Sequence, residues 1–303
     1  MLMKIAAIDI GGTNVSLYLF DDNMNILHKQ TENSQKITSS QDLIEFIEKN
    51  AKGFDAIGIA TAGSVDSESG FVHFAPNIDW LRDNPLRQTL ESYFNVHVEV
   101  ENDGNCFILG ELKFGSCKGL SRIIGYTLGT GIGGGVIIDG RLLRGIGTSE
   151  LGHISIDRNG LQCNCGKKGC LEAYCGGIWV SRFADLIAKD SENLDHSDII
   201  TTALSFYEKA LEKDDFALFF WQKWGEILGM GIAQVVNVLR PEAVVLGGKI
   251  TKASDFFLPA MIKSMKSHVF KPYDENMKVI ISQLENAALF GAGTLVLSKI
   301  MKR

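Results

Sequence analysis

The chain has 303 residues, of which 45% are hydrophobic and 22% are charged, and its formal net charge is −6. Because this length exceeds what one hydrophobic core usually supports, we expect two domains. The negative charge, in a sequence without a dense Lys/Arg block, argues against nucleic acid as a partner.

The N-terminus and the apolar runs bear on where the protein works. No basic-then-apolar leader precedes the first strand-like run, at 4–10, so we expect no secretion signal and a cytoplasmic protein. The longest uncharged apolar run, 227–239, is shorter than the ~20 residues that cross a bilayer, so we expect no membrane partner. In a reducing compartment, metal binding explains the six cysteines better than disulfides do.

The first hundred residues predict an α/β arrangement. The runs KIAAIDI (4–10) and NVSLYLF (14–20) predict two strands joined by a turn at Gly11 and Gly12. The remaining patterns alternate between the two types of element: strands near 54–60 and 96–101, and helices near 42–52 and 86–94.

The same strand-turn-strand pattern recurs in the middle of the chain. A strand at 122–128 leads into a glycine turn at 129–135 and a strand at 136–139, closed by a hairpin signal at Asp139 and Gly140. Two such units suggest two related domains, each with one glycine turn. The rest is mostly helical, with helices at 216–239 and 287–302 and a buried strand at 243–246 that ends in Gly247 and Gly248.

The glycine-rich run LGTGIGGGV (128–136) contains GxGxxG, but its context does not fit a dinucleotide-binding motif. That motif needs a helix directly after the loop, and here a strand and a hairpin follow. A protein-kinase glycine loop would require HRD and DFG motifs further along the chain, and the sequence has neither. GGK at 247–249 is not a P-loop. Glycine amides with the hydroxyls of Thr13 and Thr130 could still bind phosphate, and the alternative for either turn alone is a tight hairpin without a ligand.

The segment 150–172 carries a complete set of zinc ligands. His153, Cys163, Cys165 and Cys170 supply one imidazole and three thiols, and glycines among them let the backbone turn round an ion. The alternative is that these are ordinary buried thiols. Cys175 is a spare candidate ligand, whereas Cys106 and Cys117 are expected to be structural.

Three polar residues, Glu101, Asn102 and Asp103, lie where a strand passes into a helix that is expected at 104–114. Polar side chains at such a junction can project into a cleft. Asp103 could instead be the N-cap of the helix, and the residues alone leave both roles open.

Six motifs in order resemble the ROK family of bacterial sugar kinases and repressors. They are DIGGTN (9–14), ENDGNC (101–106), LGTGIGGG (128–135), ELGH (150–153), CNCGKKGCLE (163–172) and VVLGG (244–248). The resemblance covers almost the whole chain and includes the zinc signature.

The resemblance implies a two-domain α/β fold of the actin/hexokinase/Hsp70 ATPase type, with ribonuclease H-like domains and an active site in the cleft between them. The expected domains are 1–113 with 287–303, and 114–286. It further implies Mg-ATP and structural zinc as cofactors, Asp103 as the general base, and a homo-oligomer. The implied ligand-binding residues fall into two groups: Asn77, Asn102, Glu150, His153 and Glu172 for the sugar, and Asp9, Gly11, Gly12, Thr13, Gly129, Thr130, Gly131, Gly247 and Gly248 for the nucleotide.

The sugar itself stays open at this point. The segment RGIGTSE (144–150) is shorter than the corresponding family loop, which borders the sugar, and Ala62 replaces a usual proline. The 6-hydroxyl of glucose or a close relative is the main expectation, with N-acetylmannosamine, N-acetylglucosamine or fructose as alternatives. A sugar-responsive regulator without a DNA-binding domain, or a catalytically silent sugar-binding protein, is a further alternative.

Overall fold

The computed structural model describes residues 3–75, 78–189, 201–272 and 276–301. Two compact units can be distinguished in it. The first comprises Met1–Ile123, Gly134–Ser149 and Ser282–Arg303, and the second comprises Ile124–Gly133 and Glu150–Ile281. The expected domain boundaries, 1–113 with 287–303 and 114–286, stay a prediction. No described helix is both long and apolar enough to cross a membrane.

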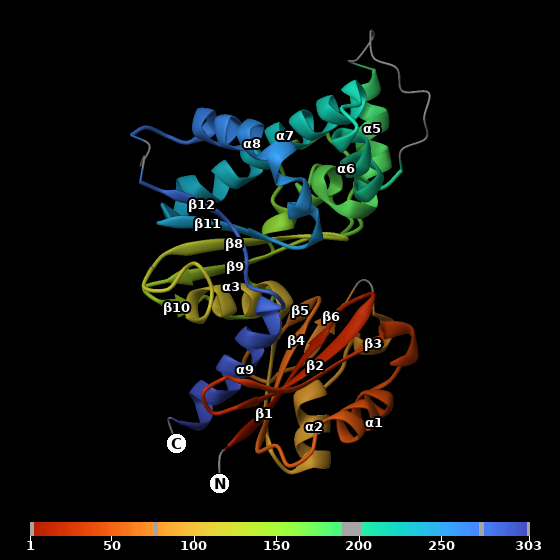
Figure 1. Cartoon of the computed structure of the whole chain (residues 1–303), viewed down its shortest axis with the longest axis vertical. Coiled ribbons are helices and arrows are strands. Elements are labelled where there is room, and N and C mark those ends of the chain that lie inside the picture. Colours follow the sequence, from red (N-terminus) through yellow and green to blue (C-terminus); the bar gives the residue numbers. More distant parts are fainter. Residues whose placement is uncertain (1–2, 76–77, 190–200, 273–275, 302–303) are drawn as a thin grey trace. The chain divides into compact units, whose positions relative to one another are not determined.

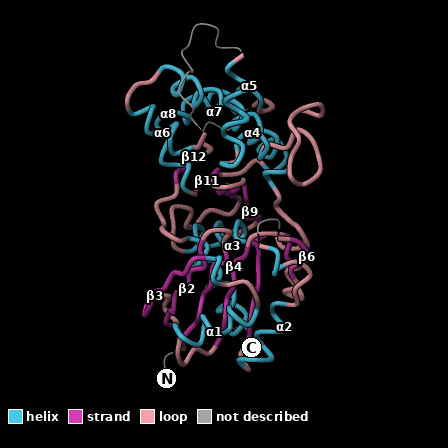
Figure 2. The backbone as a smooth tube through the Cα atoms, turned by 90° about the vertical axis from the view of Figure 1, so that its right-hand side faces the viewer, coloured by secondary structure: helices cyan, strands magenta, loops and turns pink. Residues whose placement is uncertain are grey.

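The first unit is built on a five-stranded sheet of order β3-β2-β1-β4-β7 (Figure 1, Figure 2). β1, β2 and β3 are antiparallel, whereas β1, β4 and β7 are parallel. The strands are β1 (Lys4–Ile10), β2 (Asn14–Asp21), β3 (Ile26–Asn33), β4 (Ala56–Thr61) and β7 (His97–Asn102), and a small hairpin consists of β5 (Ser64–Val65) and β6 (Val72–Phe74).

Alternation along the strands sends apolar side chains to both faces of this sheet. On one face they pack with α1 (Ser40–Asn50) and α2 (Leu86–Phe94). On the other face they pack with α3 (Asp103–Lys113) and α9 (Ala287–Ile300). α9 crosses β4 so closely that a Cβ at Gly58 would lie 2.1 Å from the Ala292 carbonyl oxygen.

A second five-stranded sheet has the order β10-β9-β8-β11-β12. Its strands are β8 (Ile123–Leu128), β9 (Ile132–Ile138), β10 (Arg141–Leu142), β11 (Ala243–Gly247) and β12 (Lys278–Ile281). The helices of the second unit are α4 (Glu172–Cys175), α5 (Val180–Ala188), α6 (Ala203–Leu211), α7 (Asp215–Leu239) and α8 (Ser254–His268). Gly225 and Gly229 of α7 let α8 approach its backbone closely, and Trp221 and Trp224 are fully buried beside them.

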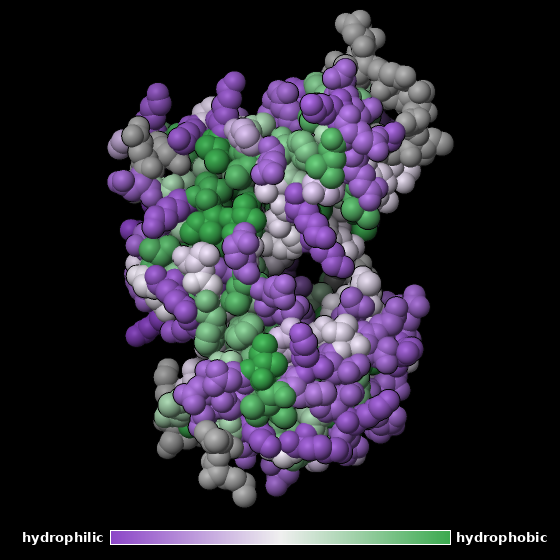
Figure 3. All heavy atoms as spheres, in the orientation of Figure 1, coloured by the Kyte–Doolittle hydropathy of each residue, from purple (hydrophilic) through white to green (hydrophobic). Residues whose placement is uncertain are grey.

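Two expectations need correction. The glycine turn predicted at 129–135 is shorter, because β9 already begins at Ile132. Gly134 and Gly135 are strand residues whose missing side chains let β9 lie against the start of α3, where a Cβ at Gly104 would lie 2.4 Å from the Gly134 oxygen. β3 was not predicted, because its residues are exposed on both faces and lack alternation; Figure 3 shows a hydrophilic surface over this region.

Candidate functional site

The parallel strands of the first sheet bring the polar ends of β1 and β7 to one edge. Asp9 of β1 is paired with Ala60 of β4, and Ala60 is paired with Glu101 of β7. The carboxyl end of each strand therefore lies at the same level, where ligands of open α/β sheets usually bind. Asp9 and Asp103 are both partly buried at this edge.

Asn102, rather than Asp103, caps helix α3. The Asn102 Oδ1 atom accepts hydrogen bonds from the amides of Gly104 (2.9 Å) and Asn105 (3.2 Å), and its Nδ2 donates to the Gly63 oxygen (3.0 Å). The prediction that Asp103 could be the N-cap is therefore wrong. Oδ1 of Asp103 accepts a hydrogen bond from the Gly104 amide at 2.9 Å, and no other neighbouring residue in the described part of the chain donates to this carboxylate.

Burial affects the ionisation of both carboxylates at this edge, and the charge of Asp103 also affects that of Asp9. Burial, followed by the neighbouring charge of Asp103, raises the pKa of Asp9 from 3.8 to about 7. Burial also raises the pKa of Asp103, against the opposing effect of the Gly104 amide. A carboxylate whose pKa lies closer to neutrality is a better proton acceptor. A bound divalent cation would reduce the repulsion between two neighbouring carboxylates.

The raised pKa of Asp9 predicts a stability change in the metal-free protein. Between about pH 4 and pH 7 the folded state keeps a proton that the unfolded state has lost, so stability falls as pH rises through this window. We expect Asp9→Asn to raise the free energy of unfolding by roughly 1–4 kcal/mol above about pH 8, and by little near about pH 4. Urea unfolding at both pH values measures this difference, and equal stabilisation at both would contradict the assignment.

The turn between β1 and β2 presents backbone donors. Gly11 donates its amide to the Asn14 oxygen at 3.0 Å, and the Ser34 hydroxyl donates to the Gly12 oxygen at 2.8 Å. Within the described residues, the amides of Gly12 and Thr13 donate to no protein atom, and both residues are exposed. Free amides of this kind can bind an anion.

The second glycine turn, Gly129–Gly131, follows β8 in the second unit. The amides of Gly177 and Ile178 donate to the oxygens of Gly129 (2.8 Å) and Thr130 (3.0 Å). Gly247 ends β11, and Gly248 lies so close to this turn that its Cβ would be 2.3 Å from the Leu128 oxygen. The role of Gly177 was not predicted, because it comes from a contact between segments far apart in sequence.

Two glycines of this turn give a matched pair of variants. A Cβ at Gly131 would lie 2.3 Å from Glu172 Oε2, whereas a Cβ at Gly129 would meet no atom within 4 Å. We expect Gly131→Ala to displace Glu172 and to lower the free energy of unfolding by about 1–3 kcal/mol, while Gly129→Ala stays near wild type. Thermal unfolding of the ligand-free variants checks this, and equal destabilisation would contradict the packing argument.

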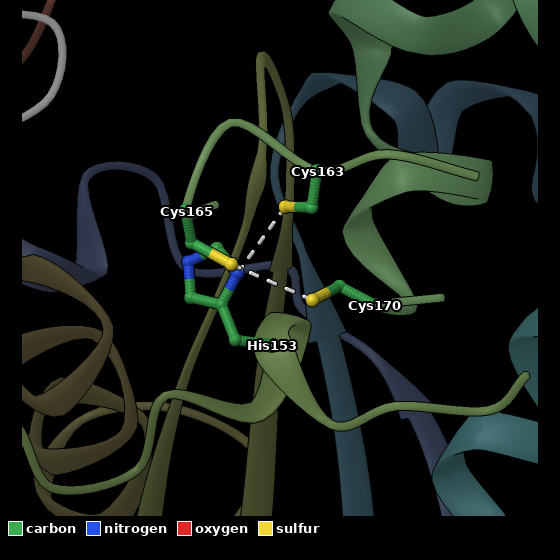
Figure 4. A group of neighbouring side chains, drawn as sticks. All are labelled: His153, Cys163, Cys165 and Cys170. Carbon is green, nitrogen blue, oxygen red and sulfur yellow. Dashed lines mark hydrogen bonds between the residues drawn. The ribbon is translucent and has the colours of Figure 1, made fainter. Parts of the chain in front are cut away.

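The four predicted metal ligands come together (Figure 4). One donor atom from each of His153, Cys163, Cys165 and Cys170 lies within 4.8 Å of the other three. The distance from His153 Nδ1 to Cys163 Sγ is 3.7 Å, and that from Cys165 Sγ to Cys170 Sγ is 3.6 Å. Because thiolates bound tetrahedrally at about 2.3 Å from zinc lie about 3.8 Å apart, the cluster has the donors and the spacing for this metal.

Close packing and hydrogen bonds to the backbone hold the cysteine segment in place. Gly169 has φ +74°, and its Cβ would lie 1.6 Å from the Asp157 oxygen, so only glycine fits there. The Tyr174 hydroxyl accepts the Leu161 amide at 3.1 Å, and Arg182 Nη1 donates to the Gln162 oxygen at 3.0 Å. Cys175 lies outside the cluster, fully buried with its thiol donating to the Trp224 oxygen at 3.7 Å.

The predicted sugar-binding residues of the second unit lie next to the metal cluster. Glu172 Oε2 accepts the Ile132 amide at 2.9 Å, and its Oε1 is 4.0 Å from Cys163 Sγ. His153 is partly buried, and Glu150 is exposed at the start of the short helix Leu151–His153. Asn77, also predicted for the sugar, lies outside the described residues.

Comparison with known proteins places the chain in a family. A model of the ROK family matches residues 5–299. The chain belongs to the ROK family. The glucokinase of Thermotoga maritima is 33% identical to it over 98% of each chain. The ROK glucokinase of Streptomyces griseus, solved with glucose and AMPPNP, is 30% identical, with a TM-score of 0.81 over 98% of this chain and 100% of its own.

These similarities confirm the predicted fold class, the α/β actin/hexokinase-type ATPase fold of ROK hexokinases. The family also includes regulators. The xylose repressor of Bacillus subtilis is 32% identical over 82% of this chain and 62% of its own. Membership of the ROK family alone therefore does not decide between a kinase and a regulator.

Proposed function

We propose that this chain is an ATP-dependent sugar kinase that transfers the γ-phosphoryl group to the 6-hydroxyl of glucose or a close relative. The observation that carries the proposal is Asp103, which lies at the carboxyl edge of the first sheet with a carboxylate that no side chain of the described residues contacts by a hydrogen bond. A regulator needs to bind its sugar, but it has no need of a proton acceptor at this place.

In the proposed reaction, Asp103 takes the proton from the sugar hydroxyl as that oxygen attacks the γ-phosphorus. The bond from this phosphorus to the β,γ-bridging oxygen then breaks, and ADP leaves. A positioned carboxylate contributes on the order of 10² to 10⁴ in rate. Asn102 supports this role because its side chain caps α3, so the Asp103 side chain is not needed as the cap.

Both glycine turns are assigned to the nucleotide. We assign the Gly11–Thr13 turn and the Gly129–Gly131 turn to the phosphates, because their glycines allow close approach of backbone amides. Gly247 and Gly248 are assigned to the adenosine. Mg²⁺ bound with ATP would offset charge on the phosphoryl group, and Asp9 is the carboxylate that we assign to it.

The assignment of the Gly129–Gly131 turn predicts an effect on ATP binding. Gly129→Ala should raise the KM for ATP, because the added methyl group would keep the phosphates away from the backbone amides.

The metal cluster supports sugar binding in this proposal. Zinc would be held by Cys163, Cys165, Cys170 and one ring nitrogen of His153. The metal would keep these four side chains in fixed positions. His153 could then offer its second ring nitrogen to a sugar hydroxyl. Glu172 and Glu150 are assigned to further hydroxyls, with the second N–H of Asn102.

A sugar-responsive regulator is the second candidate, because the xylose repressor of Bacillus subtilis is about as similar to this chain as the glucokinases are. Sugar-dependent ADP release separates the two functions. We expect the purified chain with Mg-ATP to release ADP when glucose is added, more slowly with mannose, fructose, N-acetylglucosamine or N-acetylmannosamine. If the chain binds a sugar but none of the five sugars causes ADP release, the kinase function is contradicted.

A further inference from the structure

Glu101, which directly precedes Asn102 and Asp103, is one of the most deeply buried carboxylates of the first unit, with 1% of its side chain exposed. Its Oε1 accepts hydrogen bonds from the Asn102 amide (3.0 Å) and from Asn105 Nδ2 (3.1 Å). Glu101 therefore holds the chain on both sides of Asp103. A displacement of this carboxylate would move the start of α3.

Arg144 holds the other oxygen of Glu101. Its Nε donates to Glu101 Oε2 at 2.7 Å, while its Nη2 donates to Glu99 Oε2 at 3.1 Å and to the Ser67 oxygen at 3.0 Å. The planar guanidinium thus joins two buried carboxylates and a carbonyl in one fixed geometry. The Ser67 hydroxyl adds a fourth hydrogen bond to Glu101, at 2.9 Å.

Arg144 also begins the 144–149 segment, which precedes Glu150. Ser67 ties this segment to the same network, because the Gly145 amide donates to the Ser67 hydroxyl at 3.3 Å. A single cluster of Glu101, Arg144 and Ser67 therefore fixes both the start of α3 and the start of this loop. All three residues lie in the first unit.

We propose that Arg144 and Glu101 form a positioning pair that sets the orientation of Asp103 and couples it to the 144–149 loop. The inference rests on the proposed kinase function and adds two residues to it. Neither side chain takes part in proton transfer. Their effect is geometric, and an error of about 1 Å in the position of a reacting group can cost about 10²-fold in rate.

Arg87 provides a matched control for Arg144. Both arginines pair with Glu99 Oε2, at 3.2 Å for Arg87 and 3.1 Å for Arg144, and their side chains are 14% and 22% exposed. Arg87 also donates to the carbonyl oxygens of Ser67 and Glu68, but it makes no hydrogen bond to Glu101. A merely structural role would give both arginines the same importance.

The test compares steady-state kinetics and thermal unfolding of wild type, Arg144→Gln and Arg87→Gln. We expect both variants to lose stability to a similar extent, but only Arg144→Gln to lose about 10²-fold in kcat, with the KM for ATP unchanged. Equal losses of kcat in both variants, or wild-type kcat in Arg144→Gln, would overturn the pairing. A wild type without sugar-dependent turnover would instead contradict the kinase function, and this inference with it.

Two milder variants keep the test decisive if Arg144→Gln does not fold. Glu101→Gln preserves the shape of the side chain, but in either orientation its NH2 group faces donors, either Arg144 Nε or the amide of Asn102. Arg144→Lys keeps the charge but loses the planar donor set. We expect both to fold with kcat between the wild-type value and the 10²-fold loss, and wild-type kcat in both would overturn the inference.

Discussion

Asp103→Asn is expected to lower kcat by about 10²- to 10⁴-fold while sugar binding stays near wild type. Asparagine has the same shape as aspartate and can still accept the Gly104 amide, but it cannot accept a proton from a hydroxyl. The helix should remain intact, because Asn102 provides its cap. Coupled ADP release measures kcat, and calorimetric titration with glucose measures binding.

Asp214→Asn is the matched control for this substitution. Asp214 also lies at a helix N-terminus, where its Oδ1 accepts the Ala217 amide at 2.7 Å, but the helix that it caps is α7. We expect its turnover to match wild type. Near-normal turnover in Asp103→Asn would remove Asp103 from the role of base, and loss of turnover in both variants would attribute the effect to helix stability.

Cys165→Ser is expected to release the metal and to lower activity by about 10- to 100-fold. Cys165 is the exposed member of the cluster, so the substitution removes a thiolate ligand and little packing. Without the metal, the 150–172 segment should lose the constraint on His153 and become accessible to protease. Metal analysis of the purified protein, with limited proteolysis, measures both effects.

Cys175→Ser is the control for loss of a thiol. A serine hydroxyl can replace the hydrogen bond from Cys175 to the Trp224 oxygen, and Cys175 is not part of the cluster. We expect metal content and activity to match wild type. If Cys165→Ser and Cys175→Ser retain equal amounts of zinc, the metal site is not where we place it.

Local sequence signals predicted much of this molecule for identifiable reasons. The metal ligands are close in sequence and separated by glycines, so their spacing alone predicted the cluster that the structure contains. The long helix predicted at 216–239 is observed as α7, and the strand at 96–101 as β7, shifted by one residue at each end. Strong hydrophobic periodicity or β-branched runs marked both elements.

Features that depend on distant contacts could not be predicted in the same way. Glu101 and Arg144 are 43 residues apart, and nothing in either local pattern indicates that they pair. Two adjacent residues, Asn102 and Asp103, could each cap α3, and only the observed hydrogen bonds distinguish them. Gly134 resembles a turn residue, but its role is to allow contact with Gly104.

The most direct test of the proposed function is the identity of the phosphorylated product. Phosphorus NMR of wild type incubated with Mg-ATP and glucose should show glucose 6-phosphate and ADP in equal amounts, and the Asp103→Asn reaction should show neither over the same period. Formation of free phosphate without a sugar phosphate, or the same product at the same rate from Asp103→Asn, would contradict the proposal.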